Sequence, residues 1–219
     1  MNARKLLYAL FAALLVAGFF LTQFRVRPDE RPLGKPADIL GLADRSDLNV
    51  IFVVVDTLRA DRLGCYGYPR ATSPEIDELA KEGVLFEDCT SQAPWTMQSM
   101  PSLLAGRYLT QHRNWPDQAH VLLAEQFQRA GYATIGASAN DLLTSELQYD
   151  RGFDEYDASS LPNEVDKPFD VLVKDFLPKL DALHAKRPEK PVFVYLQPFD
   201  PHFPYLEHHE FDAQLPTDE

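Results

Sequence analysis

The chain has 219 residues, of which 45% are hydrophobic and 25% are charged, a globular composition that excludes disordered, collagen-like and low-complexity proteins. Its 21 basic and 33 acidic residues give a formal net charge of −12, so it lacks the basic surface that nucleic-acid binding requires. The acidic excess lies in residues 36–219, whereas residues 1–35 are basic on balance. We therefore expect no nucleic-acid partner, and contact with anionic lipid only through the N-terminal segment.

The first predicted element is an apolar helix. Arg4 and Lys5 precede an almost wholly apolar run over residues 6–24. About 19 helical residues span roughly 28 Å, enough to cross the hydrocarbon core of a bilayer. The run predicts a transmembrane signal anchor over residues 1–24, with a cleaved signal peptide and a buried soluble helix as alternatives. The protein is then expected to be single-pass, with its folded domain on the extracytoplasmic side, periplasmic or extracellular.

Prolines and mixed charges predict a linker over residues 25–48. The folded part then begins with a strand over residues 50–55, where six β-branched or aromatic apolar residues follow one another without alternation. That pattern is typical of a strand buried on both faces, and hence of a parallel sheet with helices on either side.

The remaining segments alternate between helical and strand patterns. Helices are predicted over residues 74–81, 121–130 and 169–185, with Ser73 as an N-cap of the first and Pro178 as an interruption of the last. Strands are predicted over residues 84–87, 134–139 and 192–196. This order of elements predicts an α/β fold with a mainly parallel sheet.

Asp56 directly follows the first strand, at the carboxyl edge of the sheet where ligands of open α/β folds bind. A buried carboxylate without a partner costs several kcal/mol, so Asp56 is expected to face a cation. The residues alone leave two alternatives open: a metal ion, or an arginine such as Arg59 or Arg62.

The sequence resembles the sulfatase family of the alkaline phosphatase superfamily. The resemblance rests on residues 49–111, which include the DTLRAD element at 56–61 and LLAG at 103–106. It is echoed by Gly131-Tyr132, by DRGFD at 150–154 and by DPHFPY at 200–205. It implies an alkaline-phosphatase-like three-layer αβα domain over residues 49–219. Because family catalytic domains are about twice as long, the chain is expected to hold the N-terminal half of a truncated domain.

The same resemblance implies roles for three residues. Asp56 matches a metal-binding carboxylate, Thr96 stands at the position of the nucleophile and also contacts the metal, and His202 corresponds to a histidine near the substrate or leaving group. The implied cofactor is a divalent metal ion, with calcium first and zinc or manganese as alternatives. Threonine cannot become formylglycine, so none is expected. The residues alone favour a plainer role for Thr96, as a helix N-cap beside Trp95.

Some family positions carry other residues here. Thr57 replaces the second carboxylate of an adjacent Asp pair, Ala139 and Asp141 stand where Lys and His hold the sulfate, and Gln197 stands where a His is common. Two functions follow as expectations. The first is a sulfatase-type, metal-dependent hydrolase or transferase of a small anionic sulfate or phosphate ester. The alternative is a catalytically incompetent remnant that acts as a membrane-anchored binding module, with a partner chain completing the fold.

Cys65 and Cys89 are the only cysteines, too few for a disulfide scaffold or a zinc cluster. Two buried free thiols are the first expectation, and a disulfide between them is the alternative. The histidines and acidic residues at 207–210 are interpreted as a solvated tail, with adventitious metal binding as the alternative.

Overall fold

The computed structural model describes residues 3–23, 37, 40–41, 45, 47–108, 120–158, 168–203 and 205. The chain divides into two compact units, Met1–Gly41 and Leu42–Glu219. Most of the linker predicted for residues 25–48 lies outside the described residues, as does the tail at 207–210.

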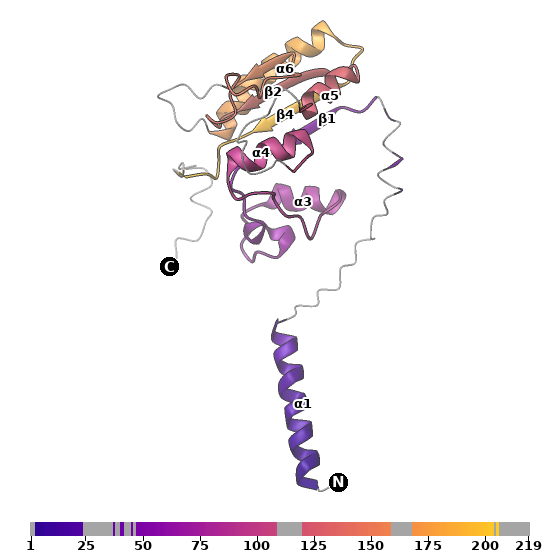
Figure 1. The fold of residues 1–219 in the computed structure, drawn as a ribbon, viewed down its shortest axis with the longest axis vertical. Coiled ribbons are helices and arrows are strands. Elements are labelled where there is room, and N and C mark those ends of the chain that lie inside the picture. Colours follow the sequence, from indigo (N-terminus) through magenta and orange to yellow (C-terminus); the bar gives the residue numbers. More distant parts are fainter. Residues whose placement is uncertain are drawn as a thin grey trace. The chain divides into compact units, whose positions relative to one another are not determined.

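The first unit contains helix α1 (Ala3–Gln23), which confirms the helix predicted from the apolar run (Figure 1). The helix also takes in the charged Arg4 and Lys5 at its beginning. Among the described residues, no helix combines the length and the apolarity needed to cross a membrane. The signal-anchor role expected for residues 1–24 stays a prediction.

The second unit is built on a sheet of four parallel strands in the order β1-β4-β2-β3 (Figure 1). The strands are β1 (Val50–Val53), β2 (Ala133–Ser138), β3 (Glu155–Asp157) and β4 (Val192–Gln197). The α/β fold and the parallel sheet predicted from the sequence are confirmed. In a parallel sheet all carboxyl ends lie at one edge, so the residues that follow β1, β2 and β4 are brought together there.

Helices cover both faces of the sheet. On one face α6 (Phe169–Lys186) packs through Leu172, Phe176 and Leu183 against the apolar side chains of β2 and β4. On the other face α4 (Thr96–Ala105) and α5 (Leu123–Arg129) share a core with Phe193 and Tyr195 of β4. Pro178 does not interrupt α6, which runs through it. The result is a three-layer αβα arrangement.

Strand β1 differs from its prediction because it is an outer strand of the described sheet. Val50 and Phe52 pack in the core with α4 and α5. Ile51 and Val53, on the opposite face, are 67% and 43% exposed. The expectation of burial on both faces was wrong for this strand: α6 covers β2 and β4, whereas no described helix covers Ile51.

One further local prediction failed, and one strand was not predicted. Residues 84–87 form no strand, and Val84 and Phe86 are 67% and 61% exposed. Strand β3 was missed because its sequence, Glu-Tyr-Asp, is short and mostly polar.

The segment after β1 is held in place by α3 (Pro74–Glu82). The short 3-10 turns η1 (Ala60–Arg62) and η2 (Gly64–Tyr66) lie in this segment. Ser73 precedes α3 as predicted, but its Oγ accepts the Gly64 N–H at 3.0 Å instead of capping the helix. Asp77 accepts the Cys65 N–H at 2.7 Å. Side chains of the first turn of α3 therefore fix the backbone that leads away from Asp56.

Candidate active site at the carboxyl edge of the sheet

Asp56 lies at the carboxyl edge, two residues beyond the Val54 N–H that bonds to Leu196 of β4. Its Oδ2 atom accepts hydrogen bonds from three side chains. Asn140 Nδ2 lies at 2.7 Å, Gln197 Nε2 at 3.3 Å and Thr96 Oγ1 at 3.5 Å. Neither Arg59 nor Arg62 is the cation expected beside Asp56, since Arg59 pairs with Asp61 and Arg62 donates to Tyr68. The structure thus places Asp56 among neutral donors.

The backbone beside Asp56 is strained. Thr57 has φ of +54°, in the left-handed region, which is rare for a β-branched residue. Such a conformation costs about 1–3 kcal/mol and persists only where the surroundings enforce it. It turns the chain sharply at the end of β1, directly after the carboxylate.

Thr96 is the first residue of α4, and Trp95 occupies the N-cap position in an extended conformation. The first N–H groups of an α-helix lack acceptors within the helix, and the helix dipole favours negative charge at this end. In α4 the Gln98 N–H is already bonded to the Trp95 carbonyl at 3.1 Å. A hydroxyl and an anion-favouring helix terminus therefore lie together beside Asp56. The Thr96–Asp56 separation of 3.5 Å is long for a hydrogen bond, as is common before a substrate tightens the geometry.

His202 belongs to the same site. Its imidazole packs on Phe199 with ring centroids 4.4 Å apart. Its Nδ1 lies 2.5 Å from the carbonyl oxygen of Phe203. Because a carbonyl can only accept, we assign a proton to Nδ1, which leaves Nε2 for proton exchange.

Asp56, Thr96 and His202 line one cavity of about 520 Å³. Its wall comes from the end of β1, residues 89–95, the first two turns of α4 and Gln197 of β4. Sequence reasoning thus named Asp56, Thr96 and His202, which the fold brings to one place. Their chemical roles stay predictions.

Sequence reasoning missed Asn140 and gave Gln197 no role of its own. Both are almost fully buried, with exposed fractions of 2% and 1%. A signal was available: Gln197 ends β4 and Asn140 comes two residues after β2, so both stand at the carboxyl edge beside Asp56. Next to Gln197, burial raises the pKa of the Tyr195 hydroxyl well above its ordinary value, with smaller contributions from Tyr156, Tyr149 and Asp56.

The described residues do not by themselves form a metal site. Within them, no group of three or more His, Cys, Asp or Glu side chains is arranged to hold a metal ion. Asp56 and Thr96 offer oxygen atoms, which suit hard cations such as calcium. The amide groups of Asn140 and Gln197, however, present N–H donors to Asp56 and add no ligand there.

The DRGFD element is structural. Arg151 Nη2 lies 3.3 Å from Glu125 Oε2, the atom that accepts the Leu122 N–H at the beginning of α5. Gly152 has φ of +86°, and a Cβ built there would lie 2.2 Å from the Glu125 nitrogen. Phe153 stacks on Phe193 of β4 with centroids 6.0 Å apart. The element therefore joins α5 to the sheet.

The cysteines are both free thiols, so the alternative of a disulfide is wrong, but they are not buried as first expected, since Cys65 is only half-buried. Cys89 is exposed and lies in the wall of the candidate site. Burial, together with Asp77, raises the pKa of the Cys65 thiol.

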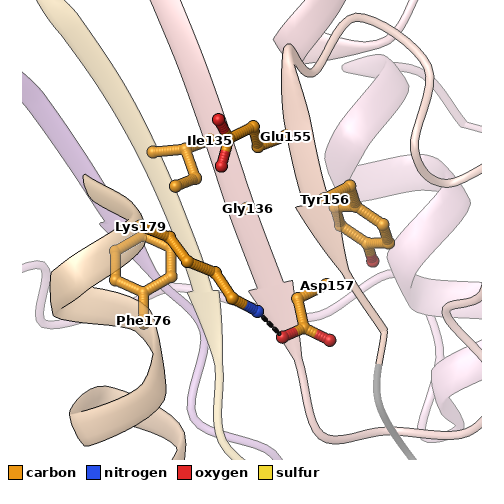
Figure 2. Close-up of a pocket in the computed structure, with 7 residues that line it drawn as sticks. All are labelled: Ile135, Gly136, Glu155, Tyr156, Asp157, Phe176 and Lys179. Atoms are coloured by element: carbon orange, nitrogen blue, oxygen red, sulfur yellow. Dashed lines mark hydrogen bonds and ion pairs between the residues drawn. The ribbon is translucent and has the colours of Figure 1, made fainter. Parts of the chain in front are cut away.

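A second cavity, of about 380 Å³, lies between β2, β3 and α6 (Figure 2). Lys179 of α6 points across it and pairs with Asp157 of β3. The pairing satisfies both charges, and the lining contains none of the candidate site residues.

The family model for sulfatases, described as Sulfatase, matches residues 48–218. Among curated relatives, an N-acetylgalactosamine-6-O-sulfatase from Bacteroides thetaiotaomicron is 32% identical over 96 residues. That alignment covers 39% of this chain and 19% of the relative. The chain therefore spans only a small part of that sulfatase.

Two solved structures have the same fold. The C-terminal periplasmic domain of EcEptC from Escherichia coli, crystallised in complex with Zn, has a TM-score of 0.60 and 17% identity, with 80% of this chain and 51% of that chain covered. The phosphonate monoester hydrolase of Agrobacterium radiobacter has a TM-score of 0.60 and 18% identity, with 77% of this chain and 44% of that chain covered. The chain spans about half of each structure. The fold and the family match together show that the chain belongs to the sulfatase family.

Proposed function

We propose that the protein acts as a sulfatase-type hydrolase or transferase of a small anionic sulfate or phosphate ester, with Thr96 as the nucleophile. The observation that carries the proposal is the convergence of Asp56, Thr96 and His202 on one cavity of about 520 Å³. The family match supports the class of reaction.

The chemistry follows from the positions of the three side chains. Thr96 Oγ1 attacks the sulfur or phosphorus atom, a new oxygen bond forms there, and the bond to the leaving oxygen breaks. The hydroxyl proton moves toward Asp56 Oδ2, 3.5 Å away. The first turn of α4 stabilises the negative charge of the ester oxygens. A protonated His202 supplies the proton that the leaving oxygen takes up.

A second step releases the group from Thr96. Water as the acceptor makes the protein a hydrolase, and an alcohol as the acceptor makes it a transferase. The Asp56 carboxylate offers oxygen atoms that accept a proton, and the Thr96 hydroxyl has a proton to donate.

The cofactor is a separate part of the proposal. A divalent metal ion, calcium first and zinc or manganese second, would bind Asp56 and Thr96 and lower the pKa of the attacking hydroxyl. The EcEptC domain, similar in fold, was crystallised with Zn. The described residues supply too few ligands to hold such an ion by themselves. Formylglycine is not part of the proposal, because residue 96 is threonine.

The experiment is a comparison of initial rates on an aryl phosphate and an aryl sulfate. Wild type is compared with Thr96→Ala and with Thr72→Ala, a threonine on the exposed surface outside the cavity. We expect hydrolysis by wild type and Thr72→Ala, and a loss of at least about 100-fold in Thr96→Ala. Equal rates in all three proteins would refute the assignment of Thr96.

A second candidate function is favoured by the exposed face of β1. The alternative of a non-catalytic binding module predicts that a partner polypeptide covers Ile51 and Val53, which are 67% and 43% exposed. Isolation of the chain from its own cells in a stable complex, without esterase activity, would favour this function over catalysis.

The compartment is also proposed. The folded domain is placed on the extracytoplasmic side of a membrane, which the periplasmic origin of the EcEptC domain supports. A reporter enzyme that is active only outside the cytoplasm, fused after residue 219, is expected to be active. Activity of a cytoplasm-only reporter at the same position would contradict the assignment.

A further inference from the structure

The carboxylate of Asp56 is held by two buried amides. Asn140 and Gln197 both direct their NH₂ groups at Oδ2, at 2.7 and 3.3 Å. The two residues are 2% and 1% exposed, so water does not readily replace either donor. They reach Asp56 from the carboxyl ends of two strands, because Asn140 comes two residues after β2 and Gln197 ends β4.

Other contacts fix which end of each amide faces Asp56. Asn140 Oδ1 accepts the N–H of Leu142 at 2.9 Å, so only its nitrogen is left to meet the carboxylate. The Asn140 backbone N–H is also held, by Ser138 Oγ at 3.1 Å. A flipped amide would lose the bond to Leu142 and place two oxygens in contact.

Gln197 is oriented in the same way. Its Oε1 is bonded to the hydroxyl of Tyr195, a side chain that is 1% exposed. The amide oxygen is therefore engaged with a residue of its own strand, and the NH₂ group is directed at Asp56.

Neutral donors affect a carboxylate differently from a cation. An arginine or lysine would satisfy Asp56 but would also cancel its charge, whereas amide N–H groups fix its position and leave the charge in place. The charge then remains available to the Thr96 hydroxyl, or to any cation that binds beside it. Networks that orient a reacting group in this way commonly contribute about 10–100-fold to activity or metal affinity.

We infer that Asn140 and Gln197 are positioning residues that hold the Asp56 carboxylate toward Thr96. The functional part of this inference rests on the proposed esterase reaction. The structural part is an energetic coupling between each amide and Asp56, and it holds whether or not the protein is an esterase.

The test is a pair of double-mutant cycles, Asn140→Ala with Asp56→Ala and Gln197→Met with Asp56→Ala, read by both thermal unfolding and activity. In the wild-type background each single change deprives the half-buried Asp56 carboxylate of a donor. We expect it to lower Tm by about 2–4 °C, corresponding to roughly 1 kcal/mol in a chain of this size. In the Asp56→Ala background the amide has no carboxylate to hold but keeps its bond to Leu142 or Tyr195, so its removal is expected to lower Tm by clearly less than in the wild-type background.

The activity readout follows the same logic. Each amide variant is expected to lose about 10–100-fold in kcat in the wild-type background, with little change in KM. In the Asp56→Ala background the further loss is expected to be less than about 3-fold, because the amides act through Asp56. A residue with a merely structural role would lower activity in both backgrounds alike.

Asn49→Ala is the matched control. Asn49 also bonds the sheet through its side chain, since its Oδ1 accepts the Val192 N–H at 2.9 Å, but at the amino end of β4. Its effect on Tm is expected to be the same in both backgrounds, with kcat unchanged.

The outcomes separate the two claims. Non-additive changes in Tm, together with no activity in the wild type, would support the contacts between the amides and Asp56 and refute the proposed function. Measurable wild-type activity with additive effects in both cycles would refute the inference and leave the proposed function intact.

Discussion

Arg187 Nη1 lies 2.6 Å from Asp154 Oδ2, and this ion pair joins the end of α6 to the residue that precedes β3. The same carboxylate oxygen accepts the Thr134 N–H at 3.0 Å. One carboxylate therefore links a helix, the central strand β2 and the DRGFD element. Burial acts to raise the pKa of Asp154, but the hydrogen bonds from Thr134 and the charge of Arg187 together hold it below its usual value.

The lowered pKa predicts a pH-dependent contribution to stability. Asp154 is more acidic in the folded state than in the unfolded state, so its contribution is present above the unfolded value near 3.8 and is lost as the pH falls through the folded value. We expect Asp154→Asn to lower the free energy of unfolding by about 1–2 kcal/mol at pH 7. This is a low value for a charged hydrogen bond, because Arg187 is 37% exposed and water weakens the ion pair.

Urea midpoints of wild type and Asp154→Asn, measured at pH 7 and at pH 3, check this prediction. The difference between the two proteins is expected to shrink at pH 3. A difference that stays constant or grows at acid pH would show that the charge of Asp154 does not stabilise the fold.

Gly152 is predicted to be irreplaceable for two separable reasons. Its φ of +86° disfavours any side chain, and an added Cβ would lie 2.2 Å from the backbone of Glu125. Gly106 shares the first reason, with φ of +61°, but an added Cβ there meets nothing within 4 Å. We expect Gly106→Ala to cost about 1–2 kcal/mol of unfolding free energy and Gly152→Ala substantially more. Equal costs in urea titrations would mean that α5 does not pack against the glycine as described.

Much of the fold follows from local sequence patterns. The apolar runs of β2 and β4 and the spacing of Leu172, Phe176 and Leu183 in α6 predict elements whose burial the structure confirms. Phe169 fits the same spacing but is 38% exposed. The patterns could not reveal that β1 is an outer strand, because its run of apolar residues reads the same whether or not a neighbour covers Ile51. Strand β3 exists through pairing with β2, not through its own three residues.

The candidate site was only partly predictable for a similar reason. Asp56 follows a strand and stands in a family motif, and Thr96 and His202 were placed by the family resemblance. Asn140 has no motif of its own. Its role depends on β2 and β1 lying in one sheet, a contact between residues 84 positions apart that no local pattern encodes.

The left-handed Thr57 offers a test of strain at the site. Asparagine tolerates a φ of +54° better than a β-branched residue does, so Thr57→Asn is expected to raise Tm by about 2–4 °C. Thermal unfolding followed by circular dichroism measures this. An unchanged or lower Tm would indicate that the Thr57 side chain contributes contacts that outweigh its backbone strain.

The exposed face of β1 can be tested without knowledge of a partner. Ile51 and Val194 are register neighbours on β1 and β4, but Ile51 is 67% exposed whereas Val194 is 4% exposed. In the isolated chain we expect Ile51→Ala to change the free energy of unfolding by less than about 0.5 kcal/mol, and Val194→Ala to cost about 2–3 kcal/mol. Similar costs at both positions would show that Ile51 is covered in solution.

The most direct test of Thr96 as the nucleophile is mass spectrometry of the protein after acid quenching during turnover of an aryl phosphate or aryl sulfate. The mechanism predicts a transient phosphoryl or sulfuryl group on the peptide that contains Thr96, absent from the Thr96→Ala protein. Steady turnover with the group on another residue, or undiminished turnover by Thr96→Ala, would contradict it.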